Sequence, residues 1–299
     1  KGKGVEHMED NPQWHGKAPQ QDIVPIIENE LESQFMIAPS IIAGDMTNLG
    51  KEVERCNEGR ADYIHLDVMD GQFVPNKTFD HTEIQKLRPL SLLPFDTHLM
   101  INDPVKHVRN YIDAGSDIIT VHAEVCDESS FGEICDQLHS NQVGIGLAIN
   151  PDTDLPQWSY KFVEMLDQII VMSVVPGKSG QKFIESTHEK IQRITKDLHD
   201  HKFEGYIEVD GGVNLENIGA CFADGGRAFV GGSAIIGQSD VRMIIKEFRN
   251  QVLDSRRRLL IKKAHDLGGT DLVNKWIDLH VVGKKKDGLV QIAKELGFQ

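Results

Sequence analysis

Eight short apolar runs recur along the middle of the chain, and stretches with a helical spacing of apolar residues separate them. Short runs rich in Val and Ile are typical of strands that are buried on both faces of a parallel sheet. The runs cover residues 36–42, 63–69, 95–100, 117–123, 143–149, 168–174, 206–210 and 228–232. The helical pattern covers residues 47–57, 82–88, 104–114, 129–140 and 186–200. This alternation predicts repeated βα units around a parallel sheet.

The number of units decides between two architectures. Eight units fit an α/β fold of the (β/α)8 TIM barrel type, which commonly takes about 250 residues or slightly fewer. A doubly wound open sheet usually has fewer strands and a glycine-rich loop after the first one, and no such loop follows residue 42. We therefore predict a barrel over residues 35–254, whose last helix ends near Leu253. The flanks are predicted to be a partly disordered N-terminal extension (1–34) and a small appendage of two or three short helices (255–299).

The charge balance excludes several classes of partner. Lys and Arg number 32 against 46 Asp and Glu, so the formal net charge is −14, and neither nucleic acid nor a membrane surface is an expected partner. No apolar run approaches the roughly 18 residues of a membrane span. The first residues lack the apolar segment of a secretory signal, so a cytoplasmic location is expected. The four cysteines lack C-x-x-C spacing, which favours reduced thiols over disulfides. Barrels of this size often associate, which leaves a homo-oligomer open.

Polar side chains gather where the predicted strands end, which is where a (β/α)8 barrel carries its reactive groups. His65 and Asp67 alternate on one face of the run 63–69, His98 lies near the end of 95–100, and Asp210 ends 206–210. Two imidazoles and two carboxylates suit one divalent ion such as Zn, Fe(II), Mn or Co better than Ca or Mg.

A single His or Asp near a strand end is more often a satisfied core or capping group than a ligand. Four of them are harder to explain in that way, because burying two carboxylates without a cation costs several kcal/mol. The fourth predicted strand adds His122 and Glu124 to the same end of the barrel.

Glycines follow three consecutive predicted strands and suggest a phosphate site. The loops after residues 174, 210 and 230 place backbone N–H groups where an anion can approach, and the last loop is expected to lead directly into a helix. A glycine in a turn often means only a tight turn, so each loop alone is weak evidence. The residues concerned are Gly177, Lys178, Ser179, Gly180, Gly211, Gly212, Gly232 and Ser233.

Three methionines also stand at strand ends, namely Met69, Met100 and Met172. Methionine commonly fills gaps in a core, and that interpretation stays open. The alternative is an apolar lid over the metal site, which would exclude water and strengthen the electrostatic effect of the ion.

With these residues in view, the sequence resembles the ribulose-phosphate 3-epimerase family over about residues 36–245. The matching pieces are IAPSI (37–41), HLDVMDGQFVPN (65–76), DTHLM (96–100), TVHAE (120–124), GLAI (146–149), VDGGV (209–213) and GGSAI (231–235). The resemblance implies a sugar phosphate as partner and an isomerase that inverts C3 of a ketose phosphate, first of all D-ribulose 5-phosphate to D-xylulose 5-phosphate.

The resemblance also implies roles for individual residues. His65, Asp67, His98 and Asp210 correspond to the metal ligands, and the two aspartates are also the acid and the base on either face of a metal-stabilised enediolate. Ser40 and His98 are implied to face the substrate under an apolar cap of the three methionines. Phosphate is implied to lie at Gly180, Gly211, Gly212, Gly232 and Ser233.

Some positions depart from the family's usual pattern. Lys178 and Ser179 stand where the loop usually has Phe and Gly, and Asp80 and Asn150 replace a usual Gly and Lys. The same reaction on a hexulose or heptulose phosphate, such as allulose 6-phosphate, therefore stays open, as does a non-catalytic barrel that binds sugar phosphate. We hypothesise that Lys178 contacts the substrate phosphate or a longer sugar chain.

Overall fold

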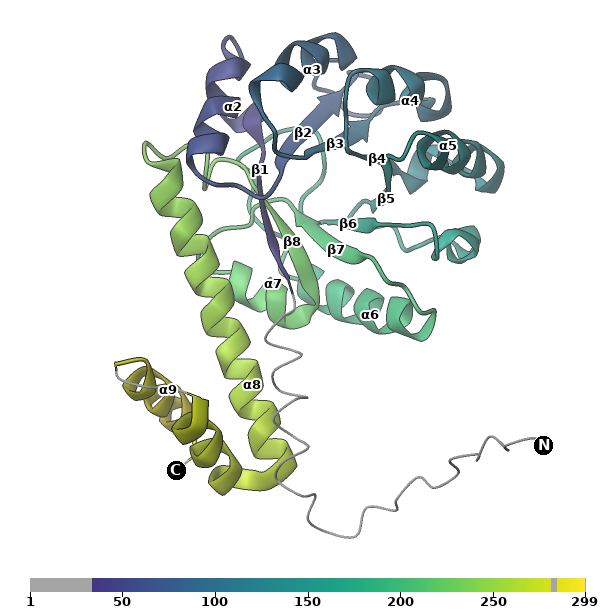
Figure 1. Cartoon of the computed structure of the whole chain (residues 1–299). Helices are drawn as coiled ribbons and strands as arrows, with labels where there is room; N and C mark the ends of the chain where they lie inside the picture. Colours follow the sequence, from purple (N-terminus) through teal and green to yellow (C-terminus); the bar gives the residue numbers. More distant parts are fainter. Residues whose placement is uncertain (1–33, 281–283, 299) are drawn as a thin grey trace, which may run out of the picture. The chain divides into compact units, whose positions relative to one another are not determined.

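The structure is a computed structural model that describes residues 34–280 and 284–298. Eight parallel strands form one sheet whose order is β1-β8-β7-β6-β5-β4-β3-β2. Their bounds are β1 (Met36–Pro39), β2 (Ile64–Met69), β3 (Phe95–Met100), β4 (Ile118–His122), β5 (Gly144–Ile149), β6 (Gln168–Met172), β7 (Tyr206–Asp210) and β8 (Gly226–Gly231). A parallel bridge between Ser40 and His65 joins the end of β1 to β2 and closes the ring seen in Figure 1. The predicted (β/α)8 barrel is confirmed, while the predicted N-terminal extension lies, except for Gln34, outside the described residues.

Helices surround the strands in Figure 1. The α-helices of the barrel are α2 (Leu49–Glu58), α3 (His81–Leu87), α4 (Pro104–Asp113), α5 (Glu128–Ser140), α6 (Thr187–Asp200), α7 (Ile218–Asp224) and the first part of α8 (Val241–His280). Short 3-10 helices are η1 (Ile41–Ala43), η2 (Arg88–Leu90), η3 (Ala123–Val125) and η4 (Gln157–Phe162). Between β5 and β6, η4 takes the place that an α-helix holds in most of the other units.

Local sequence signals set where several helices begin. Asn48 accepts a hydrogen bond from the backbone N–H of Lys51 at the start of α2, and Asp80 accepts one from Thr82 at the start of α3. Asp127 and Ser130 form a reciprocal capping box at the start of α5. Caps of this kind satisfy backbone N–H groups that have no partner within the helix and typically contribute about 1 kcal/mol each.

Alternation along the strands separates two environments. In β2, the buried side chains of Leu66 and Val68 belong to the large apolar core that packs between strands and helices. The intervening His65, Asp67 and Met69 are also buried but lie outside that core. The interior of the barrel can therefore hold a polar cluster without interrupting the packing that stabilises the fold.

The tail differs from the prediction in one respect. The helix expected to end near Leu253 continues to Leu267, and the non-helical backbone of Gly268 and Gly269 separates it from a second helix within the span labelled α8 (Val241–His280). Arg and Leu are good helix formers, and no Gly or Pro interrupts residues 241–267, so nothing in the sequence stops the helix earlier. Contacts divide the chain into a compact unit of residues 34–257 and a second one that includes residues from Arg258 onward. The domain boundary at residues 254–255 stays a prediction.

The second unit has a small core of its own. Its buried apolar residues come from α8 and from α9 (Lys284–Glu295) and are Leu260, Ile261, Ala264, Leu272, Val273, Ile277, Leu289, Ile292 and Ala293.

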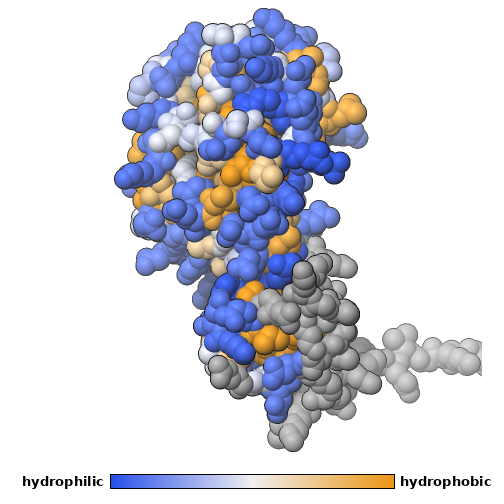
Figure 2. Space-filling model, turned by 90° about the vertical axis from the view of Figure 1, so that its left-hand side faces the viewer, coloured by the Kyte–Doolittle hydropathy of each residue, from blue (hydrophilic) through white to orange (hydrophobic). Residues whose placement is uncertain are grey.

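On the barrel, Figure 2 shows mainly hydrophilic side chains over the face in view, in keeping with the charged composition. Within the described part of the chain, none of the helices has the length and apolar character needed to cross a bilayer.

Candidate active site and metal centre

The four predicted ligands lie in one buried cluster at the ends of β2, β3 and β7. One ligand atom from each of His65, Asp67, His98 and Asp210 can be chosen so that all four lie within 4.8 Å of one another. Asp67 Oδ1 is 3.1 Å from both His65 Nε2 and His98 Nδ1, and Asp210 Oδ2 is 3.4 Å and 3.2 Å from the same two nitrogens. The strand register explains the meeting of β2 and β3, because Asp67 pairs with His98 across them.

A buried carboxylate that the sequence analysis did not single out orients the first imidazole. Asp96 Oδ2 lies 2.7 Å from His65 Nδ1, and Asp96 Oδ1 accepts a hydrogen bond of 2.8 Å from Gln168 Nε2. A hydrogen on Nδ1 leaves the lone pair of His65 Nε2 directed at the cluster, which is the arrangement that metal-ligating histidines commonly show. Asp96 precedes His98 by two residues, so strand alternation alone could have placed it on the inward face.

The second imidazole has a different partner. His98 Nε2 lies 2.7 Å from His122 Nε2, and His122 Nδ1 lies 3.1 Å from Glu124 Oε2. His98 and His122 are both fully buried. Burial is the main reason why the pKa of His122 is below its ordinary value, so this ring is neutral.

The charges of the cluster depend on one another. Burial alone would raise the pKa of Asp67 and Asp210, but the two imidazoles lower both below their ordinary value. Burial would in turn lower the pKa of His65 and His98, yet the neighbouring carboxylates raise both. The carboxylates thus require positive charge beside them, either as protons on the rings or as a cation.

The donor set fits a divalent metal ion. Asp210 Oδ2 is buried and makes no hydrogen bond of good geometry among the described residues, although two ring nitrogens lie close to it. An oxygen in that position is free to bind a cation. Two nitrogen and two oxygen ligands suit Zn, Fe(II), Mn or Co, which agrees with the chemistry expected from the sequence.

Below the cluster the barrel holds one more acid. Glu208 is fully buried, with its Oε1 3.5 Å from His65 Nδ1, and burial followed by the charge of Asp96 raises its pKa well above the ordinary value. Glu208 is therefore neutral, and it adds no further negative charge to the cluster.

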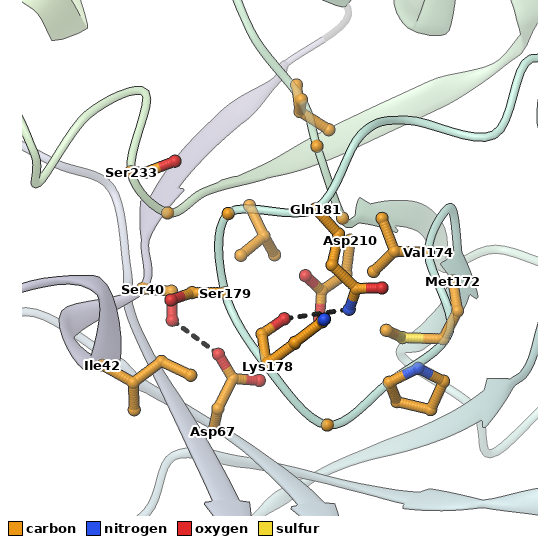
Figure 3. A pocket seen from close by; sticks show the side chains of 18 of the residues that line it. Ser40, Ile42, Asp67, Met172, Val174, Lys178, Ser179, Gln181, Asp210 and Ser233 are labelled. Carbon is orange, nitrogen blue, oxygen red and sulfur yellow. Dashed lines mark hydrogen bonds between the residues drawn. The ribbon is translucent and has the colours of Figure 1, made fainter.

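A pocket opens above the cluster and is bordered by residues from several loops (Figure 3). Asp67 and Asp210 line it, and Ser40 Oγ donates a hydrogen bond of 2.5 Å to Asp67 Oδ2, as drawn in Figure 3. His98 does not line this pocket, although it was expected to face the substrate. The other predicted lining residues are all there, namely Met69, Met100, Met172, Gly177, Lys178, Ser179, Gly180, Gly211, Gly212, Gly232 and Ser233. Ile42, Val174 and Gln181 line it as well and were not predicted.

Glycine occupies different positions of the pocket for different physical reasons. Gly211 (φ +125°) and Gly212 (φ +65°) have positive φ, and an added Cβ would lie 2.4 Å from Val174 and 2.4 Å from the backbone of Phe183, respectively. Tight loop packing therefore accounts for both. At Gly232 φ is not positive, and an added Cβ would meet only Ala43 at 3.7 Å. Neither the backbone conformation nor internal packing requires a glycine there.

The loop after β8 differs from the expectation of a helix. Ile236 and Gly237 donate backbone hydrogen bonds to Gly232 and Ser233, which closes a single helical turn, and α8 begins only at Val241. The helix-start signal lies further on, because the side chain of Asp240 accepts a hydrogen bond from Met243 N–H. The pocket thus has turn residues, but no α-helix N-terminus, at Ser233.

Fold and site together define a (β/α)8 barrel enzyme with a His/Asp cluster that could hold a metal ion beneath a glycine-rimmed pocket. The chain belongs to the ribulose-phosphate 3-epimerase family, a family of isomerases: the family model described as "Ribulose-phosphate 3 epimerase family" matches residues 36–236. A ribulose-phosphate 3-epimerase of Bacillus subtilis is 40% identical over 215 residues, which cover 71% of this chain and 97% of the relative. One from Escherichia coli K12 is 36% identical over 220 residues, covering 73% and 96%.

Solved structures share the fold at much lower identity. The 3-keto-L-gulonate-6-phosphate decarboxylase of Vibrio cholerae superimposes with a TM-score of 0.56 at 15% identity and covers 74% of this chain and 98% of its own. At that identity the likeness is one of fold alone.

Proposed function

We propose that this chain is a metal-dependent ketose-phosphate 3-epimerase that interconverts D-ribulose 5-phosphate and D-xylulose 5-phosphate. One observation carries the proposal: two buried carboxylates on β2 and β7 meet two imidazoles in a single cluster at the floor of the pocket. The relatives are named ribulose-phosphate 3-epimerases, which supports a ribulose phosphate as substrate and C3 as the reacting carbon.

His65, Asp67, His98 and Asp210 would hold the ion, which could be Zn, Fe(II), Mn or Co. When bound, it would polarise the substrate carbonyl and stabilise the negative charge that develops beside it. Each aspartate directs one oxygen to the imidazoles, Oδ1 in Asp67 and Oδ2 in Asp210. The other oxygen of Asp67, Oδ2, accepts the hydrogen bond of Ser40 at the edge of the pocket.

Asp67 and Asp210 then perform the proton transfers. One carboxylate takes the hydrogen from C3 as a proton, and the electron pair of that bond passes into the enediolate. The other residue, protonated beforehand, returns a proton to the opposite face of C3, so the configuration inverts and no atom is gained or lost. Ser40 holds Asp67 in place through its hydrogen bond, and such positioned groups typically contribute 10²–10⁴-fold in rate.

The rim of the pocket would take the phosphate. At Gly232 the space of a missing side chain is open to the pocket, which lets backbone and phosphate approach closely. Ser179 and Ser233 add hydroxyl groups, and Lys178 adds a positive charge that can contact the phosphate or the end of a longer sugar. An apolar wall beside the reacting carbons would come from three nearly fully buried methionines, Met69, Met100 and Met172.

A panel of ketose phosphates incubated with the protein in deuterium oxide tests the proposal. We expect deuterium at C3 and inversion with D-ribulose 5-phosphate, loss of both after chelation, and recovery when a divalent ion is returned. Asp67→Asn and Asp210→Asn should each lower kcat by at least about 10²-fold. Preference for a hexulose or heptulose phosphate would change the substrate but not the reaction. Binding without exchange for every sugar would instead indicate a non-catalytic barrel.

A further inference from the structure

We infer that Glu124, acting through His122, is a positioning residue that fixes the hydrogen of His98 on Nε2 and so turns the lone pair of His98 Nδ1 toward the metal site. Glu124 lies on η3, beyond the first ring of ligands, and neither Glu124 nor His122 lines the pocket. The inference rests on the metal site of the proposed function and assigns a further residue to it.

Three polar groups form an unbroken chain that starts at the cluster. His98 Nε2 and His122 Nε2 are 2.7 Å apart, and His122 Nδ1 and Glu124 Oε2 are 3.1 Å apart. The two rings are inclined by only 20°, and their centroids are 4.9 Å apart. Because the nitrogens are much closer than the centroids, the rings meet edge to edge, which is the geometry of a hydrogen bond between them.

The carboxylate at the end of the chain is firmly held. Glu124 Oε1 accepts a hydrogen bond of 2.6 Å from the backbone N–H of Asn150, which follows β5. Asn150 is in turn fixed by Lys190, whose Nζ donates to its carbonyl oxygen. Burial would raise the pKa of Glu124, but hydrogen bonds to His122 and Asn150 lower it to about 2. Glu124 is therefore ionised and can only accept hydrogen bonds.

Because the Glu124 carboxylate can only accept, it determines which atom carries each hydrogen in the series Glu124, His122 and His98. His122 Nδ1 must donate to Glu124, so a His122 ring that carries a single hydrogen has its lone pair on Nε2. Only one hydrogen fits between the two Nε2 atoms, and it must then belong to His98. When a cation displaces the second ring proton, the lone pair of His98 is therefore on Nδ1, and this atom lies 3.1 Å and 3.2 Å from oxygens of Asp67 and Asp210. The metal-facing tautomer of His98 is thus set by a residue 26 positions further along the chain.

Glu124→Gln is the variant that separates orientation from packing. The glutamine keeps the length and shape of the side chain but can present its NH₂ group to His122 Nδ1. That reverses the chain and places a hydrogen on His98 Nδ1, where it competes with the ion. We expect a 10- to 100-fold loss of Zn²⁺ affinity, the range observed when such outer partners are removed. Glu128→Gln is the matched control, because Glu128 is exposed and contacts only Lys161 among the pairs the structure gives it.

Two measurements on the full-length protein test the inference. Zn²⁺ affinity is measured by competition with a chromophoric chelator for wild type, Glu124→Gln and Glu128→Gln. The ¹⁵N shifts of the imidazoles in zinc-loaded wild type report directly which nitrogen of His98 carries hydrogen, even if the variant does not fold. Equal affinity of Glu124→Gln and wild type, hydrogen on His98 Nδ1, or a wild type that binds no zinc would each overturn the inference. A wild type that binds zinc with the expected tautomer but epimerises no ketose phosphate would refute the proposed function alone.

Discussion

Replacing Gly232 with alanine tests the phosphate site without disturbing the fold. The added methyl group would meet only Ala43 Cβ at 3.7 Å, an ordinary contact, and the backbone is not in the left-handed region. Alanine there should even raise the free energy of unfolding by about 0.4–1 kcal/mol, because it restricts the unfolded chain. For a barrel of this size that corresponds to a rise in Tm of roughly 1–4 °C.

The same methyl group should damage catalysis, because it occupies the space through which the phosphate approaches the backbone. A lost hydrogen bond to a charged group costs about 1.5–3 kcal/mol, which converts to a fall in kcat/KM of roughly 10- to 150-fold. We expect most of the decrease in kcat/KM to come from an increase in KM, since the phosphate is bound equally in the ground state and the transition state. Steady-state kinetics with D-ribulose 5-phosphate, together with thermal unfolding, gives both numbers.

Two other glycine variants serve as controls for Gly232→Ala. Gly132→Ala in α5 adds a methyl group 3.5 Å from Phe162, far from the pocket, and should stabilise the helix with unchanged kinetics. Gly212→Ala should destabilise the protein by at least about 1–2 kcal/mol, given its positive φ and a methyl group 2.4 Å from backbone. The reasoning fails if Gly232→Ala leaves KM unchanged, or if its Tm falls as far as that of Gly212→Ala.

Three further perturbations address the metal and the substrate. Asp96→Asn should weaken Zn²⁺ binding by roughly 10- to 100-fold in a chelator competition, because the amide no longer fixes the hydrogen of His65; unchanged affinity would contradict that role. Lys178→Ala should raise KM for whichever ketose phosphate is the substrate, and an unchanged KM across the panel would remove Lys178 from the site. The raised pKa of His65 and His98 means that their protons stabilise the metal-free fold fully below about pH 6.5 and less as pH rises through the raised pKa. Mn²⁺ should therefore raise Tm more at pH 8 than at pH 6, and equal gains at both values would show that the ion does not displace these protons.

The four residues of the candidate metal cluster could be predicted because two simple rules coincide. Side chains alternate along a strand, and a (β/α)8 barrel carries its functional groups at the carboxyl ends of its strands. His65, Asp67, His98 and Asp210 satisfy both, and the structure brings them together. Neither rule requires knowledge of the register, that is, of how far each strand is shifted along its neighbour.

The partners of these residues depend on that register, which the sequence does not contain. Asp96 reaches His65 because the two residues pair in the register of β2 and β3, and it also contacts Gln168 of β6 across the barrel. His98 pairs with Thr120 in register, while its ring reaches His122. The prediction of a helix at Ser233 was wrong for a local reason, since a closed single turn competes with it and Asp240 is the better cap. The helix predicted to end near Leu253 runs further because the first residues that break it are Gly268 and Gly269.

The charges inside the barrel suggest why a divalent ion suits this cluster. With Glu208 neutral, the carboxylates of Asp67, Asp96 and Asp210 face the rings of His65 and His98. The carboxylates of Asp67 and Asp210 and two protonated rings together carry no net charge, and the same two carboxylates, two neutral rings and one divalent ion also carry none. Exchange of two protons for one ion therefore leaves the buried charge unchanged, so the desolvation cost of the cluster is similar in both states. A monovalent ion would leave an additional negative charge buried, and a trivalent ion would leave an additional positive one. The acids and histidines of the interior thus match the +2 charge of the ion as well as its preferred ligand atoms.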